Sequence, residues 1–219
     1  MHSPLKDYLP FATTLFGAFF GALGVYWVGR FKEKRDEINR LHTALVAAQY
    51  ALFSQWNIVE DLRKNFLEPF RKDVEHRHEK QLNYIRAVGE LKVPFDELTF
   101  IIASKTPNLL QEIHIAEKRF TASMQLLDAL NKKRLEIQDK YPPKSFDMKT
   151  GRGTEMVVPA YEVYRLKSFT DLLYDEVDRT LPDLTNTNQK LFDFIKNNLK
   201  GRESMKLVHD ESQTDKANK

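Results

Sequence analysis

An uncharged segment of 22 residues, Tyr8 to Gly29, constrains this chain more than any other feature of the sequence. As an α-helix rising 1.5 Å per residue, such a segment extends roughly 33 Å, which matches the hydrocarbon thickness of a bilayer. Tyr8 lies at one end and Tyr26 and Trp27 at the other, where aromatic rings favour the interface between lipid and water. The sequence therefore predicts one transmembrane helix over residues 8–29, preceded by a short N-terminus, residues 1–7.

A cleaved signal peptide is the main alternative for an apolar segment so near the N-terminus. It would require a basic leading region, a shorter apolar core and a cleavage site of small residues. Here Lys6 is offset by Asp7, and the segment ends in Trp27-Val28-Gly29-Arg30. These features favour a helix that is retained.

Basic residues are distributed unevenly on the two sides of the segment. Lys6 alone precedes it, and five follow it: Arg30, Lys32, Lys34, Arg35 and Arg40. The positive-inside rule then places the C-terminal side in the cytoplasm and the N-terminus outside, as expected in a bacterial inner membrane. Contact with anionic lipid is worth about 1 kcal/mol per well-placed cation, and the membrane is thus the first expected partner. Acidic neighbours and a net charge of only +3 argue against nucleic-acid binding.

Small residues recur within the apolar segment. Gly17 and Gly21 form a GxxxG pattern, Ala18 and Ala22 form a parallel small-xxx-small pair, and Gly24 lies near the same face. Such residues allow two membrane helices to approach closely, which predicts self-association. Glycine is also simply common in membrane helices, so both interpretations stay open.

Below the apolar segment, apolar residues recur at alternating intervals of three and four, as in a heptad pattern. This seam is formed by Ile38, Leu41, Leu45, Ala48, Leu52, Val59, Leu62 and Phe66, with Gln55 as the polar exception. No proline or glycine lies between Arg30 and Glu68, so the membrane helix is expected to continue as one long helix over 30–68. The seam is either the core face of a bundle helix, which is favoured, or a coiled coil between chains.

Further along the chain, apolar spacing and prolines predict more helices and no extended sheet. The expected elements are helices over 71–90, 94–103 (short), 107–140 and 159–200 (kinked at Pro182), with a loop over 141–158 and a disordered tail over 201–219. The predicted fold is all-α: one N-terminal transmembrane helix that continues into a cytoplasmic bundle, residues 30–200, of about four long helices and one short helix.

A search for chemistry assigns no catalytic, cofactor-binding or metal-binding residue. The chain has no cysteine, which excludes disulfides and thiolate ligands. The stretch VEHRHEK contains one Glu-x-x-His pattern, Glu75 with His78, whereas a di-iron bundle needs two; the pairing of His76 with Glu79 is common on solvated helix faces. His78 also falls within an apolar stripe, so a core or edge histidine is favoured over a ligand.

Two other stretches have simple structural interpretations. TGRGTE follows no predicted strand and has no lysine in P-loop register, so it is predicted to be a loop. An apolar group between helices, Phe95, Phe100, Ile101 and Ile102, could form a groove for a partner, but a plug at the end of the bundle is favoured.

The layout is similar to that of many small bacterial inner-membrane proteins, some of which act in signalling or in defence against phage. We expect a non-enzymatic protein whose cytoplasmic domain self-associates or recruits a soluble protein; no small-molecule ligand or cofactor is identified. A membrane-disrupting effector triggered through that domain is one alternative. An enzyme of unrecognised type is another, and convergence of Gln55, His78 and His114 in the fold would favour it.

Overall fold

The computed structural model describes residues 5–79, 91–104, 106–142, 145–147, 152–154 and 157–199. The side chains of residues 5–13, of Leu15 and of the two strands lie outside this description, and so does the predicted disordered tail. The chain divides into two compact units, residues 1–44 and residues 45–219. One long helix, α1 (Leu5–Asp61), passes from the first unit into the second.

The first unit consists of the N-terminal part of α1, which is helical throughout the segment predicted to cross the membrane. Its large apolar side chains between Phe16, which is 62% exposed, and Phe31, which is 67% exposed, lie at the surface. Within the described part of the chain, we find no helix that combines the length and apolar character that a bilayer crossing requires. Residues 8–13 of the predicted segment have side chains outside that description.

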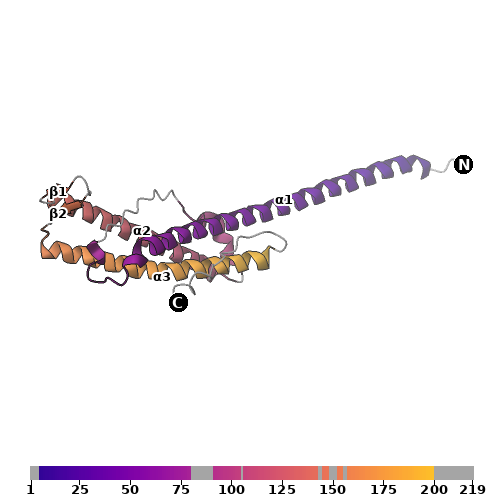
Figure 1. Cartoon of the computed structure of the whole chain (residues 1–219). Helices are drawn as coiled ribbons and strands as arrows, with labels where there is room; N and C mark the ends of the chain where they lie inside the picture. Colours follow the sequence, from indigo (N-terminus) through magenta and orange to yellow (C-terminus); the bar gives the residue numbers. More distant parts are fainter. Residues whose placement is uncertain are drawn as a thin grey trace. The chain divides into compact units, whose positions relative to one another are not determined.

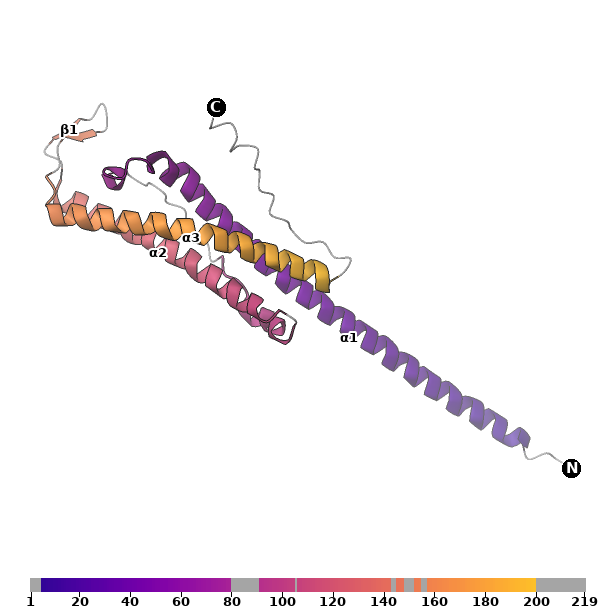
Figure 2. The same ribbon diagram turned by 90° about the horizontal axis from the view of Figure 1, so that it is seen from below.

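The second unit is a helical bundle built from the rest of α1, α2 (Asn108–Lys140) and α3 (Ala160–Asn198). Helices α2 and α3 lie side by side in both views (Figures 1 and 2). They are antiparallel, because Glu112 near the start of α2 pairs with Lys190 near the end of α3, and Lys133 near the end of α2 pairs with Glu162 near the start of α3. Their bounds agree within one or two residues with the helices predicted over 107–140 and 159–200.

Prolines position the long helices. Pro107 and Pro159 immediately precede α2 and α3, where a missing backbone N–H costs nothing. Pro182 lies inside α3, which continues through it without a break. Its ring is exposed.

The end of α1 departs from regular α-helix. Residues Leu62–Leu67 form a π-helical turn, η1, followed by a 3-10 turn, η2 (Glu68–Phe70). The backbone N–H of Glu68 donates to the carbonyl of Arg63, five residues earlier, and Pro69 follows without an N–H to continue the pattern. The helix predicted over 30–68 is therefore α-helical only to Asp61 and continues as π-helical and 3-10 turns.

The helix predicted over 71–90 is wrong for the residues that the structure describes. Residues 71–76 are turns, and only Arg77–Glu79 forms a short 3-10 helix, η3; residues 80–90 lie outside the described part. The cause is tertiary: Arg71 and Arg77 reach across to the carboxylates of Asp178 and Asp171 on α3, and Val74 is exposed.

The short helix predicted over 94–103 is present as η4 (Phe95–Ala103), but it is a 3-10 helix. Its buried residues, Leu98 and Ile101, are three apart, which suits a helix with three residues per turn. The predicted loop over 141–158 contains a small antiparallel hairpin, in which β1 (Ser145–Asp147) pairs with β2 (Arg152–Thr154). Apart from these two strands, the described chain is helical or irregular, which confirms the all-α class.

The core lies where the apolar stripes of α1, α2 and α3 meet within the second unit. Fully buried members include Leu52 of α1, Ile113 and Leu130 of α2, and Leu173 and Leu191 of α3. All five positions belong to the periodic stripes from which the helices are predicted.

Candidate functional site

The surface that most needs explanation is the N-terminal part of α1, because large apolar side chains usually avoid water. Its exposed members are Phe16, Phe19, Phe20, Leu23, Val25, Tyr26, Trp27, Val28 and Phe31. At 100° per residue, these positions surround the helix rather than forming one stripe. A helix that is apolar on all sides is typical of a buried environment, protein or lipid.

The glycines of this helix leave open space beside it. A Cβ atom added at Gly17, Gly21 or Gly24 would meet nothing within 4 Å. Ala18 and Ala22 are exposed as well. Larger side chains would therefore be tolerated within one chain, which makes these positions sensitive reporters of any contact with a second helix.

The basic residues that follow are all exposed. They are Arg30, Lys32, Lys34, Arg35 and Arg40. The guanidinium of Arg30 lies 5.9 Å from the ring centre of Tyr26, one turn earlier, so an aromatic and a cation share this level of the helix.

The seam residues lie mostly inside the chain. The central and lower positions, Leu45, Ala48, Leu52, Val59 and Leu62, are buried, and Gln55 is buried among them. Ile38, Leu41 and Phe66, at the two ends, are half-buried. Gln55 donates its amide N–H to the backbone carbonyl of Leu91, 2.8 Å away, which explains a polar residue at a core position.

Segment 71–79 is attached to α3 by arginines that surround Tyr174. Arg71 binds Asp178 through two hydrogen bonds of 2.8 Å, and Arg77 binds Asp171 at 2.7 Å. The same guanidinium groups lie 5.4 Å and 4.3 Å from the ring centre of Tyr174. Burial raises the pKa of Tyr174, and the two cations oppose this effect.

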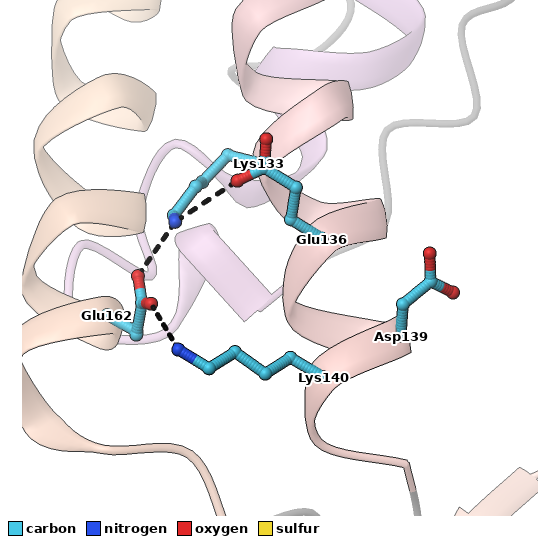
Figure 3. Close-up of a pocket in the computed structure, with 5 residues that line it drawn as sticks. All are labelled: Lys133, Glu136, Asp139, Lys140 and Glu162. Carbon is cyan, nitrogen blue, oxygen red and sulfur yellow. Dashed lines mark hydrogen bonds and ion pairs between the residues drawn. The ribbon is translucent and has the colours of Figure 1, made fainter.

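A second polar cluster joins the end of α2 to the start of α3 (Figure 3). The ammonium of Lys133 lies 2.9 Å from one carboxylate oxygen of Glu162, and that of Lys140 lies 3.9 Å from the other. The hydrogen bond from Lys133 lowers the pKa of Glu162, against the effect of burial. Glu136 and Asp139 also line this open pocket, and Asp139 points away from the pair. Since each cation faces a carboxylate of the chain, the cluster has the character of a structural clamp.

The histidine-rich stretch is not assembled into a metal site in the described residues, where no three potential ligands lie together. His76 is exposed and bonds Asp73 through its Nδ1 at 3.1 Å, whereas His78 is buried, and Glu75 and Glu79 are exposed. His78 is thus a core histidine, as its position in the apolar stripe predicts.

The remaining sequence candidates have separate environments. Ile101 is fully buried, as expected of a plug, whereas Ile102 is exposed, and Phe95 and Phe100 are half-buried. His114 is exposed and packs its ring edge-on against that of Phe95, with 5.3 Å between ring centres.

The three residues whose convergence would favour an enzyme do not line one site. His78 lines a cavity between η3, α2 and α3, and neither Gln55 nor His114 lines it. Glu79 and Arg134 also line that cavity, and Arg134 is not among the residues that the sequence singles out. A signal was present: Arg134 interrupts the apolar stripe Leu127, Leu130, Ile137 of α2.

No protein-family model, curated protein or solved structure matches this chain. The surfaces and cavities of the chain itself therefore carry the evidence on its function.

Proposed function

We propose that this chain is a single-pass membrane protein of a bacterial inner membrane whose helical domain acts as a non-enzymatic platform. The observation that supports the anchor is the exposure of apolar side chains on all sides of α1 between Phe16 and Phe31. Water would make this arrangement costly, at about 25 cal/mol per Å² of apolar surface, and lipid removes the cost. The uncharged segment from Tyr8 to Gly29 supplies the length.

Charge asymmetry supports the orientation of the anchor. The exposed basic residues between Arg30 and Arg40 lie directly after the apolar segment, and only Lys6 precedes it. We place the helical domain in the cytoplasm and the N-terminus outside on this basis.

The task proposed for the platform is self-association or recruitment of a soluble protein at the membrane. The open face at Gly17 and Gly21 supports self-association through the anchor, because two helices can approach closely there. The seam supports it less, because its central residues, such as Leu52, are already buried within one chain.

Cysteine accessibility tests the anchor and its orientation directly, since the natural chain has no cysteine. We would prepare Ser3→Cys, near the N-terminus, and Ser168→Cys, at an exposed position of α3. In intact cells a membrane-impermeant maleimide should label the Ser3→Cys variant alone, and after permeabilisation it should label both.

Labelling of the Ser168→Cys variant in intact cells would overturn the orientation. Release of the unmodified chain into the soluble fraction would overturn the anchor itself. Dye entry upon expression, with the chain retained in the membrane, would favour the membrane-disrupting effector over the platform.

A further inference from the structure

A cavity of about 350 Å³ lies between the short helix η3, the C-terminal half of α2 and the first turns of α3. His78 lines it from η3, Arg134 and Ile137 from α2, and Val163 and Leu166 from α3. Its wall thus combines an arginine and a histidine with branched apolar side chains. This volume and composition are typical of sites for small ligands.

Arg134 is the unusual member of this wall. Only 8% of its surface is exposed, yet no carboxylate of the described residues pairs with it. Its Nη2 donates to the backbone carbonyl of His78 over 2.9 Å, while its Nη1 is buried without a partner among the described residues. Burial lowers the pKa of Arg134 to about 10, so the guanidinium remains a cation at neutral pH.

His78, which lines the same cavity, carries a second unpaired group. It is 6% exposed, and its Nδ1 has no hydrogen-bond partner in the described part of the chain. Burial lowers the pKa of His78, with Glu79 acting in the opposite direction and Lys167 in the same one. The ring is therefore neutral near pH 7 and donates from Nδ1 in one of its two tautomers.

We propose that this cavity binds a small organic anion, whose carboxylate or phosphate oxygens accept hydrogen bonds from Nη1 of Arg134 and Nδ1 of His78 and whose apolar part packs on Ile137, Val163 and Leu166. A buried charge without a counter-ion is costly, and a bound anion removes that cost. Guanidinium groups suit carboxylate and phosphate oxygens in particular. A metal ion is disfavoured here, because Arg134 would repel it.

Glu79 also lines the cavity, and its carboxylate would compete with a bound anion for Arg134. Glu79 is exposed, so it lies at the rim, and the unpaired Nη1 of Arg134 shows that the two groups do not bind each other. Its negative charge would weaken binding of an anion. We therefore expect Glu79→Gln to strengthen it.

Thermal unfolding of the full chain in a mild detergent, followed by circular dichroism, gives the first test. The probes are inorganic phosphate, acetate, hexanoate and phenyl phosphate, each compared with sodium chloride at equal ionic strength. We expect hexanoate or phenyl phosphate to raise the melting temperature more than acetate or inorganic phosphate, because only the first two fill the apolar part. Short-chain phosphatidic acid tests a lipid headgroup as the source of the same chemistry, and stabilisation by it alone would assign the site to lipid.

The variants separate binding from folding. Arg134→Met should weaken binding of the best probe at least about tenfold in calorimetry, since it removes charge-assisted hydrogen bonds. Arg134→Lys, which keeps the charge, should bind at an intermediate level. Lys132→Met, an exposed change on the same helix, is the matched control and should bind as the natural chain does.

Two outcomes would overturn the proposal. If no probe raises the melting temperature above the chloride control, water alone solvates Arg134 and His78. If Lys132→Met weakens binding as much as Arg134→Met, the anion is attracted by surface charge only. Should Arg134→Met fail to fold, the comparison of Arg134→Lys and Glu79→Gln still decides, because the proposal requires them to change affinity in opposite directions.

Discussion

The hydroxyl of Tyr174 donates a hydrogen bond to the backbone carbonyl of Leu67, 2.8 Å away, and both residues are buried. The carbonyl belongs to the last residue of the π-helical turn η1, at the junction with the 3-10 turn η2. A side chain of α3 thus forms a hydrogen bond with the backbone at the end of the first helical segment. The chain can leave the helix there and place Arg71 and Arg77 on the ring of the same tyrosine.

Removing this hydroxyl should destabilise the bundle. Tyr174→Phe keeps the ring but removes the hydrogen bond to the Leu67 carbonyl, which costs about 1 kcal/mol. Urea unfolding of the full chain, followed by circular dichroism, measures the difference. Tyr164→Phe, at an exposed position of the same helix, should change the free energy of unfolding by less than about 0.5 kcal/mol. Equal effects of the two changes would show that the hydrogen bond has no net value.

Ser123 and Thr180 form a buried hydroxyl pair between α2 and α3, 3.0 Å apart. Thr180 donates its own proton to the carbonyl of Glu176, so Ser123 must be the donor within the pair. Thr180→Val strands the Ser123 hydroxyl and should cost more than Ser123→Ala, which should cost about 1 kcal/mol. In a double-mutant cycle, the combined variant should lose less than the sum of the single changes. Strict additivity would contradict a direct interaction.

Much of the bundle can be predicted from the sequence, because α2 and α3 are long, strongly periodic and preceded by prolines. The structure of segment 71–79 cannot be predicted in the same way. Its ion pairs join Arg71 and Arg77 to Asp178 and Asp171, about a hundred positions later in the chain, and no local pattern encodes such a contact. The period of three between Leu98 and Ile101 is also too short to separate a 3-10 helix from an α-helix.

Only part of the proposed anion cavity can be predicted from the sequence. His78 and Arg134 each occupy a position within an apolar stripe, and a polar residue at such a position signals a special environment. Their proximity depends on how η3 packs against α2, since they lie 56 positions apart in the sequence. Sequence periodicity identifies both residues as exceptions, whereas only the fold places them around one cavity.

Leu52 tests whether the seam is internal to one chain, since its side chain is fully buried there. Leu52→Ala should cost about 2–5 kcal/mol through lost burial and a residual cavity. In a chain that carries Gly17→Ile and Gly21→Ile, whose N-terminal helix should not associate, the unfolding midpoint should not depend on protein concentration. A midpoint that rises with concentration in that chain would show that the seam also joins chains. Tyr50→Ala, at an exposed position on the same helix, serves as the control.

Glu162 should make the stability of the bundle sensitive to acid. Its pKa in the folded chain lies below the ordinary value of 4.5, chiefly because Lys133 donates to it. The contribution of Glu162 to the free energy of unfolding is therefore complete above pH 4.5, the ordinary pKa. It is lost as the pH falls through the lower pKa that Glu162 has in the folded chain. The gap in unfolding free energy between the natural chain and Glu162→Gln should shrink over that interval. Glu136→Gln, which alters a more exposed carboxylate beside Lys133, should show a smaller change.

The glycines of the N-terminal helix provide the sharpest test of assembly. A Cβ at Gly17 or Gly21 meets nothing within 4 Å in the single chain, so Gly17→Ile with Gly21→Ile should leave the helical domain folded. Between two closely packed helices the same side chains would overlap, and the oligomer should dissociate. Crosslinking in native membranes measures the oligomer. Gly29→Ile is the matched control, because it adds the same side chain in open space about 120° around the helix from Gly17. If the natural chain crosslinks as a monomer, or if the double variant assembles as the control does, the proposed self-association through this face is wrong.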